Sequence, residues 1–462
     1  MSGTSESLVP NMLAGTSFSD GEARLQIDSP DELQNNIVVL VTGANTGLGY
    51  STCQRLIDEF EKNFPNTHKL TLLITTRRPP AQVRDLKNDL RKYALRLGSQ
   101  VAERIRILAE TLDLLNLSSV RALSRRLNRN FPKLDAIILN AGIGGWSGLD
   151  WPKAIYNVLT DMVHATTWPS YKIGYVGMVV PKQTQQPEEK PLGSVFCSNV
   201  FGHYMLAHNV MPLLRRSGQP NGPGRVIWLS SIEATTNFFN VDDIQALKSG
   251  TAYESSKALT DLLALTSDLP STAPWVKSFL STSESDDDDD SSKPTPTNYV
   301  GHPGVCGTSI VPLLLPLVYC MIAAFYLARW LGSPWHPNTP YLGANAPVWL
   351  ALSPQSTLDA AEKPYREKGG GRVKWGSSTD IFGNAAVVST ETDGWGFGGV
   401  VGGPILAADK ARRRKRGMKV ATVEDRVRFE ELGRRCWQYL EELRVEWDKL
   451  LDTLEQEDGG DS

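Results

Sequence analysis

The apolar positions of this chain fall into short runs separated by segments with helical spacing. The first run, Asn36 to Val41, leads into a glycine-rich turn and then into apolar residues at helical intervals, which predicts a strand, a turn and a helix. Further strands are predicted at 70–76, 105–108, 134–142 and 224–231, and a last one ending at 302–304. Because strands alternate with helices, we expect an α/β fold with a doubly wound parallel sheet over residues 36–310.

Several segments interrupt or extend this predicted core. Residues 1–35 are expected to form a disordered lead. Residues 150–192, rich in Trp, Tyr and Pro, are too long for a simple loop and are expected to cover a substrate cleft. Residues 283–297 join an acidic run to prolines, which predicts a flexible, solvent-facing loop. The C-terminal extension, 332–462, is predicted to contain loops and short strands over 369–403 and then a long amphipathic helix.

That C-terminal helix has a start signal and an apolar face. Thr422 and Asp425 match a capping box. The residues predicted to dock one face of the helix on the protein are Val427, Leu432, Cys436, Leu440, Leu443, Trp447, Leu450 and Leu454. The preceding basic run, Lys410 to Arg416, is interpreted as a solvated helix entry, with a patch for anionic lipid headgroups as the alternative.

Residues Ile310 to Leu331 are almost wholly apolar until Arg329. Their number approaches the roughly 20 residues that a helix needs to span a bilayer. Pro312 and Pro316, however, would break the first turns of a spanning helix. We therefore expect membrane contact through this segment, and a buried helix that covers the site is the alternative.

Composition excludes some functions and compartments. Lysine and arginine total 48 against 51 acidic residues, so the net charge of −3 gives no reason to expect a nucleic-acid partner. The five cysteines are scattered, odd in number and form no CxxC pair, which predicts a reducing compartment and neither structural disulfides nor a metal site. The N-terminus lacks the basic stretch and apolar core of a secretory signal.

The turn TGANTGLG, Thr42 to Gly49, carries the first candidate chemistry. Glycines between a strand and a helix let the backbone approach a pyrophosphate at the helix N-terminus. A tight turn that needs positive φ is the alternative, but the flanking strand and helix favour binding. The cofactor contacts predicted here are Gly43, Asn45, Thr46, Gly47, Leu48 and Gly49.

Two arginines end the second predicted strand. Arg77 and Arg78 stand where a dinucleotide-binding domain meets the adenosine ribose. An NAD site normally carries a carboxylate there for the 2′-hydroxyl, whereas arginine suits a 2′-phosphate. The sequence therefore predicts NADPH/NADP+ as the cofactor, and two ordinary surface arginines are the alternative.

Five motifs occur in a single order along the chain. They are TGxxxGxG at 42–49, NAG at 140–142, the serine that ends GRVIWLSS, YxxxK from Tyr253 to Lys257, and PGxxxT from Pro303 to Thr308. Together they resemble the short-chain dehydrogenases/reductases over roughly residues 36–310. The resemblance implies a Rossmann-type fold and an oxidoreductase.

The resemblance also implies roles for matching residues. Tyr253 would donate its phenolic proton to a carbonyl oxygen, and Lys257, one helical turn later, would hold the nicotinamide ribose. A lysine charge at about 5 Å would stabilise the phenolate by roughly 3 kcal/mol, so we expect a lowered pKa for Tyr253. Ser231 would bind the substrate oxygen, with Ser230 as the alternative, and Asn199 would support a proton relay. The other implied cofactor contacts are Asp113, Asn140, Ala141, Gly142, Cys306 and Thr308.

One departure from the general family is a longer spacing between Ser231 and Tyr253. This insertion, the YESSKALTDLLAL helix, TTRRPP after the second strand and the apolar segment after HPGVCGTSI resemble fungal 3-ketosteroid reductases of ergosterol biosynthesis. Such an enzyme reduces the 3-keto group of a 4-methyl sterol, such as 4-methylzymosterone, to a 3β-hydroxyl during C4 demethylation. The resemblance implies a sterol substrate, other sterol C4-demethylation enzymes as partners, and the cytosolic face of the endoplasmic reticulum membrane or lipid droplets.

Two other functions remain open from the residues alone. A reductase of retinal or another lipophilic ketone would share every catalytic residue. A non-catalytic membrane scaffold subunit of a sterol complex would account for the apolar segment, the basic run and the long terminal helix. The intact Ser231, Tyr253 and Lys257 favour an enzyme over a scaffold.

Overall fold

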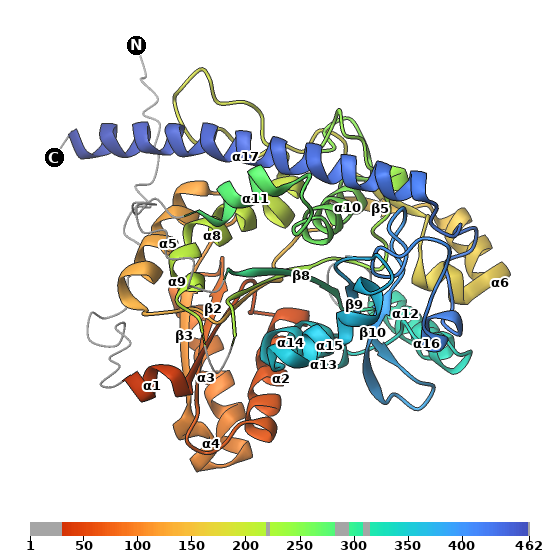
Figure 1. The fold of residues 1–462 in the computed structure, drawn as a ribbon, viewed down its shortest axis with the longest axis horizontal. Coiled ribbons are helices and arrows are strands. Elements are labelled where there is room, and N and C mark those ends of the chain that lie inside the picture. Colours follow the sequence, from red (N-terminus) through yellow and green to blue (C-terminus); the bar gives the residue numbers. More distant parts are fainter. Residues whose placement is uncertain (1–29, 219–221, 282–294, 308–314, 461–462) are drawn as a thin grey trace, which may run out of the picture.

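The computed structural model describes residues 30–218, 222–281, 295–307 and 315–460 (Figure 1). The predicted disordered lead lies outside these residues except at its end, where Pro30–Asn35 forms helix α1. The predicted acidic loop lies outside them up to residue 294, and its last residue already begins a strand. Thr308 also lies outside the described residues.

An eight-stranded sheet forms the centre of the molecule and confirms the predicted doubly wound α/β fold. Its order is β10-β9-β8-β7-β4-β1-β2-β3, and all neighbouring strands are parallel except β9 and β10. The strands are β1 Asn36–Val41, β2 Lys69–Thr76, β3 Ile105–Thr111, β4 Ala136–Leu139, β7 Arg225–Leu229, β8 Thr297–His302, β9 Lys374–Thr379 and β10 Ala385–Thr390. The chain runs outward from β1 to β3 and then crosses to β4 on the other side of β1. Ligands bind beside the carboxyl ends of strands at such a reversal.

Helices cover both faces of this sheet (Figure 1). Successive residues of β1 point to opposite faces, so Val38 and Leu40 join one buried apolar cluster while Val39 and Val41 join the other. The first cluster is covered by α5 Leu117–Asn130, α7 Ser194–Phe196, the π-helical turn η1 Cys197–Phe201, α8 Gly202–Asn209, α9 Met211–Arg215, α10 Ala252–Leu265 and α11 Ala273–Leu280. The second is covered by α2 Gly47–Asn63, α3 Pro80–Leu97, α4 Ser99–Arg104, α13 Pro340–Gly343, α14 Asn345–Leu352 and α15 Gln355–Arg366. Two short helices, η2 Thr236–Phe238 and α16 Ala407–Lys410, lie in connecting segments.

The C-terminal extension completes the sheet. Strand β9 pairs in parallel with β8 and is buried along its whole length, and β10 closes the edge as an antiparallel neighbour. The sequence predicts only loops and short strands here, because KWGSST in β9 lacks the apolar run of the other central strands. Its side chains are instead satisfied by partners: Lys374 forms a buried ion pair with Asp261 of α10, with the two charged atoms 2.7 Å apart.

Helix α17, Val423–Gly460, lies across the outer side of α10 and α11 (Figure 1). The predicted capping box is present, because the Asp425 amide donates to Thr422 Oγ1 over 3.2 Å and the Thr422 amide donates to the Asp425 carboxylate over 3.0 Å. Most of the predicted docking face is buried, with Cys436, Leu440, Leu443, Trp447 and Leu450 in the core. Val427 is a correction: it is 60% exposed, because the first turns of α17 pack through Phe429 against Trp395 instead.

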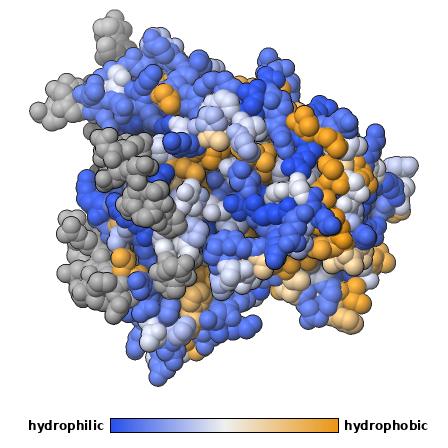
Figure 2. Space-filling view, viewed as in Figure 1, coloured by the Kyte–Doolittle hydropathy of each residue, from blue (hydrophilic) through white to orange (hydrophobic). Residues whose placement is uncertain are grey.

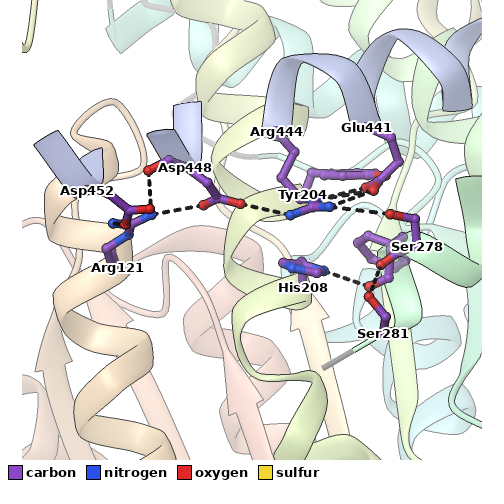
Figure 3. A network of polar contacts seen from close by, with 10 residues as sticks. Arg121, Tyr204, His208, Ser278, Ser281, Glu441, Arg444, Asp448 and Asp452 are labelled. Carbon is purple, nitrogen blue, oxygen red and sulfur yellow. Dashed lines mark hydrogen bonds and ion pairs between the residues drawn. The ribbon is translucent and has the colours of Figure 1, made fainter. Parts of the chain in front are cut away.

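Ion pairs hold the second half of α17 in place (Figure 3). Arg444 pairs with Glu441 and Asp448 on its own helix, and Glu441 accepts a 2.5 Å hydrogen bond from the buried Tyr204 of α8. Arg121 of α5 binds Asp448 and Asp452. The helix is thus fixed both by its apolar face and by charged groups at that face's border.

A second layer is added at one end of the sheet by the 150–192 insertion. The insertion contains α6 Trp151–Thr167 and β6 Lys172–Gly174, and β6 pairs antiparallel with β5 Trp146–Leu149, which directly precedes the insertion. Helix α12, Leu315–Trp330, is the described part of the predicted apolar segment and packs against α6. Within the described chain, none of the helices combines the length and apolarity needed to cross a bilayer.

Helices α6 and α12 expose much of their apolar surface. Leu159 is 81% exposed and Tyr319 is 65% exposed, and only Ala328 and Arg329 of α12 are buried. Figure 2 shows hydrophobic surface gathered at the end of the molecule where Figure 1 draws these two helices. Helix α12 is therefore not buried, whereas its place over the cavity agrees with the other part of that alternative.

The basic run before α17 is largely paired within the protein. Arg416 and Arg413 both contact Asp161 of α6, at 2.6 and 3.7 Å, and Arg414 binds Glu391. Arg412 binds the buried Asp409. These arginines therefore tie the segment to α6 and to β10 rather than standing free in solvent.

Candidate active site

The glycine-rich turn after β1 leaves room for a phosphate group. Gly43 and Gly47 adopt φ of 67° and 55°, which side chains rarely tolerate. A Cβ on Gly49 would lie 2.1 Å from the Gly43 carbonyl oxygen, so the turn can close only around glycine. Helix α2 begins at Gly47, and Thr46 before it makes no side-chain capping bond to the described residues, which leaves the first amides of the helix open. This geometry fits the pyrophosphate of a dinucleotide.

The residues after β4 brace that turn. The Asn140 side chain donates to the Thr42 and Gly43 carbonyl oxygens, over 2.8 and 3.3 Å, and the amides of Asn140 and Ala141 both donate to Thr42 Oγ1. His203 holds the other side of that hydroxyl, with its ring nitrogen 2.9 Å away. Its burial lowers the pKa of His203 to about 3, so the ring stays neutral. These hydrogen bonds thus hold the ends of β1 and β4 together beside the glycine-rich turn.

The remaining predicted cofactor contacts line the same cavity. Its wall includes Asn45, Thr46, Leu48, Asp113, Gly142 and Cys306. Asp113 is fixed by accepting a bond from the Leu115 amide over 3.0 Å. Burial raises the pKa of the Cys306 thiol to about 12, so this cysteine is a neutral lining group.

Arg77 and Arg78 extend from the end of β2 into the edge of this cavity. Both are exposed, and neither guanidinium has an ion-pair or hydrogen-bond partner among the described residues. Strand β2 ends at Thr76 and is followed directly by the two arginines, so no carboxylate stands at the strand end where an NAD site normally carries one. Two uncommitted cations at this place fit a 2′-phosphate.

Ser231, Tyr253 and Lys257 meet in the same cavity, beyond the glycine turn. Ser231 follows β7, and α10 places Tyr253 and Lys257 one turn apart on the same face. The Lys257 ammonium lies 5.7 Å from the centre of the Tyr253 ring and donates to the Leu229 carbonyl over 2.7 Å. Ser230, the alternative serine, directs its hydroxyl to the Lys257 carbonyl oxygen over 3.3 Å. Ser231 is therefore the serine that faces the tyrosine.

Asn199 sits in a π-helical turn between α7 and α8. Such single turns open a helix locally and often accompany functional sites. Its side chain makes a two-way clasp with Ile143, accepting from the amide over 2.8 Å and donating to the carbonyl over 3.0 Å. It also donates to Ser256 Oγ over 3.0 Å. Asn199 thus joins the helix to the segment after β4 and to α10, next to Lys257.

The electrostatics of Tyr253 differ from the prediction. Burial is the main cause that raises its pKa above the ordinary value, and the nearby Glu233 carboxylate acts in the same direction, while the Ser231 hydroxyl opposes them. The predicted net lowering of the Tyr253 pKa is therefore wrong for this structure. Burial also lowers the pKa of Lys257 to about 8, which weakens its average charge at alkaline pH. Tyr253 is held as a neutral phenol, the form that donates a proton.

The cavity side chains that the sequence did not predict include three beside Tyr253: Trp146, Lys172 and Glu233. The Trp146 ring lies 4.7 Å from that of Tyr253, and Lys172 stands over both rings. Trp146 and Lys172 come from β5 and β6, whose irregular sequence carries no motif. For Glu233 the only local indication was its place two positions after Ser231, and this alone does not predict a role in the site.

The cavity has a volume of about 900 Å³ and passes from the glycine turn to an apolar mouth. The mouth is lined by α6 and α12, through Ala154, Ile155, Val158, Leu159, Leu317, Met321, Ala324 and Phe325. Ligand sites commonly combine such apolar walls with a few fixed polar groups. Here the polar groups gather at Tyr253, between the glycine turn and the mouth.

The chain was compared with known proteins. No family model matches it. It is 56% identical over 439 residues to the 3-keto-steroid reductase erg27 of Aspergillus fumigatus, covering 93% of this chain and 98% of that one. It is 37% identical over 463 residues to the 3-keto-steroid reductase of Gibberella zeae, covering 90% and 95%.

Solved structures with a similar fold include salutaridine reductase from Papaver somniferum, at 16% identity and a TM-score of 0.40, over 69% of this chain and 96% of that chain. A 7α-hydroxysteroid dehydrogenase complexed with NADH is also similar, at 16% identity and a TM-score of 0.39, over 71% and 91%. The likeness to the fungal relatives runs over nearly the whole chain, motifs and C-terminal extension together. The chain therefore belongs to the 3-keto-steroid reductases, which are oxidoreductases.

Proposed function

We propose that this protein uses NADPH to reduce the 3-keto group of a 4-methyl sterol to a 3β-hydroxyl, a step of sterol C4 demethylation in ergosterol biosynthesis. The observation that carries the proposal is the meeting of Ser231, Tyr253 and Lys257 at the junction between the glycine turn and the apolar mouth. A ketone at the end of a long apolar molecule would reach these groups while its rings stay among the apolar side chains of α6 and α12.

The side chains have separate tasks in this reaction. When bound, NADPH supplies the hydride that adds to the carbonyl carbon. Ser231 and the phenol of Tyr253 hold the carbonyl oxygen, and the phenolic proton passes to that oxygen as its negative charge develops. Lys257 stabilises the phenolate that remains, and Arg77 and Arg78 bind the 2′-phosphate that distinguishes NADPH from NADH.

The exposed apolar surface of α6 and α12 supports membrane contact at the cavity mouth. A sterol partitions into the bilayer, so a mouth that rests on the membrane interface would receive it without passage through water. This fits a place on the cytosolic face of the endoplasmic reticulum or on lipid droplets, beside the other C4-demethylation enzymes.

The test is NADPH oxidation by purified protein with 4-methylzymosterone, retinal and an aliphatic ketone in parallel, with the product identified by mass spectrometry. Turnover of the sterol to the 3β-alcohol supports the proposal. Turnover of retinal but not of the sterol would assign the site to another lipophilic ketone. No turnover of any of them, with intact fold, would favour a non-catalytic scaffold subunit.

A further inference from the structure

A buried cluster of charges lies directly beside the proposed proton donor. The ammonium of Lys172, on β6, is 4.1 Å from the centre of the Trp146 ring and 5.2 Å from that of Tyr253. It contacts the Glu233 carboxylate closely and the Glu254 carboxylate at 3.3 Å. The Lys172 side chain is only 6% exposed. A lysine is rarely so buried without partners that require it.

The two carboxylates come from elements that the reaction needs. Glu233 follows Ser231 by two residues, and its amide donates to Ser231 Oγ over 3.1 Å. Glu254 follows Tyr253 directly on α10. Two negative charges this close to a phenol oppose the loss of its proton, because the phenolate would be a third.

We propose that Lys172 is a positioning residue for the proton donor: its ammonium neutralises Glu233 and Glu254 beside Tyr253 and so keeps the phenol able to release its proton to the substrate carbonyl. The inference rests on the proposed reduction, in which one proton leaves Tyr253 Oη for the carbonyl oxygen while the hydride adds to carbon. Through the backbone of Glu233, the same ion pair also fixes the direction of the Ser231 hydroxyl.

Several charged or titratable groups of the described residues face this phenol and together set how readily it loses its proton. They are Lys257 and Glu254 on α10, Glu233 after β7, Lys172 on β6 and Cys306 after β8. Glu233 and Glu254 both act to raise the pKa of Tyr253. Lys172 in turn opposes the rise that burial imposes on the pKa of Glu233 and so favours the charged form of that carboxylate.

The first measurement is the pH dependence of the reverse reaction, oxidation of the 3β-alcohol with NADP+, in which Tyr253 must accept a proton. Activity therefore rises as Tyr253 loses its own proton. In Lys172→Met this rise moves to higher pH by about one unit or more, because a positive charge near the phenol is lost. In Glu233→Gln it moves to lower pH, because a negative charge is lost. Lys172→Arg restores the wild-type profile.

A matched control is Lys248→Met, in the same insertion as Glu233 but with an exposed side chain, which leaves the profile unchanged. If Lys172 had a purely structural role, Lys172→Met and Glu233→Gln would both react more slowly, but their pH profiles would not move in opposite directions. Shifts of the same sign, or no shift, would overturn the proposal.

A second measurement needs no turnover and so separates this inference from the proposed function. Tyrosinate absorbs near 295 nm, and subtracting the matching Tyr253→Phe protein isolates the signal of Tyr253. At one alkaline pH, Glu233→Gln contains more Tyr253 tyrosinate than the double variant Lys172→Met/Glu233→Gln. Equal signals would refute the role of Lys172 whether or not the sterol is reduced, and unequal signals without sterol turnover would refute only the substrate.

Discussion

At the scale of single residues, the polar end of the cavity is built from side chains with one task each. Tyr253 is neutral, Lys257 is tethered to the Leu229 carbonyl, and Ser231 is aimed by the Glu233 amide. Such fixed placement matters because little reorganisation is left for the moment of reaction. Replacing one of these side chains should therefore lower the reaction rate strongly and change the stability of the fold only slightly.

Tyr253→Phe removes the proton donor and keeps the ring that packs at a tilt against Trp146. Turnover of the sterol is expected to fall by about a thousandfold or more, whereas NADPH binding and the melting temperature stay near wild type. Steady-state kinetics and cofactor fluorescence measure both. Substantial remaining turnover would mean that another group donates the proton.

Arg77 and Arg78 have no partners in the described protein, so their removal costs the fold little. In the double alanine variant, KM for NADPH is expected to rise by roughly 10- to 100-fold, while KM for NADH changes little, because only NADPH carries the 2′-phosphate. Arg84→Ala, an exposed arginine on α3, is the matched control and should leave both KM values unchanged. An equal loss for both cofactors would contradict a 2′-phosphate site.

Residues in the motifs were predictable because their chemistry depends on local spacing. Gly43 to Gly49 lie in one turn, and Tyr253 and Lys257 lie one helical turn apart. Lys172 and Trp146 were not predictable, because only the tertiary packing of β5 and β6 brings them to Tyr253. The pKa of Tyr253 was mispredicted for the same reason: Glu233 was absent from the sequence argument.

At the scale of elements, the apolar runs predicted the central strands, and the short strands predicted over 369–403 are present as β9 and β10. Their place in the main sheet was not predicted. Strands β1, β2 and β4 are buried on both faces and read as continuous apolar runs. Strand β9 is equally buried but polar, because Lys374 and Ser377 find partners in other elements. No local pattern reveals such partners.

Helices α6 and α12 are expected to bind membranes as a pair. Leu159→Glu/Tyr319→Glu places two charges on their exposed face and should reduce binding to phosphatidylcholine vesicles several-fold, since each charge opposes burial at the interface. Vesicle flotation measures this. Leu95→Glu, at a 57% exposed site on α3, should have no effect. If the wild type, the double variant and Leu95→Glu bind vesicles equally, α6 and α12 do not form the membrane contact.

Helix α17 depends on its buried aromatic residue. Trp437 packs against Phe279 and Tyr204, with ring centres 5.4 and 5.9 Å away, and its indole N–H donates to the Leu263 carbonyl. Trp437→Ala is expected to lower the free energy of unfolding by about 3–5 kcal/mol. Val427→Ala on the exposed start of the same helix should change it by less than about 0.5 kcal/mol. Chemical denaturation compares the two, and similar values would show that α17 is only loosely docked.

At the scale of the whole molecule, the C-terminal extension and the motif-bearing part form one unit. Lys374 of β9 binds both Asp261 and the Ser231 carbonyl, so the extension reaches the back of the proposed active site. Its charge also acts to lower the pKa of Lys257.

Lys374→Met therefore has an effect on pH dependence as well as on stability. The pKa of Lys257 is lowered to about 8, so wild-type reductase activity should fall as pH rises through that region and Lys257 loses its charge. Without Lys374 the pKa of Lys257 rises, and the fall moves to higher pH. The melting temperature drops because Asp261 is left buried and unpaired. Lys368→Met, at an exposed position nearby in the sequence, should change neither the pH profile nor the melting temperature. If the pH profile of Lys374→Met does not move, β9 has no electrostatic effect on the site.

The docking of α17 also bears on how the protein is made. Its ion pair between Arg121 and Asp452 joins residues 331 positions apart. A ribosome delivers the N-terminus first, so the sheet emerges without β9 and β10, and α5, α8 and α10 emerge without the helix that covers them. Their apolar outer faces remain open until α17 itself has been synthesised. Production of this protein is thus expected to depend on chaperones that shield nascent chains, and premature stop codons even within α17 should yield protein that is degraded rather than shortened enzyme.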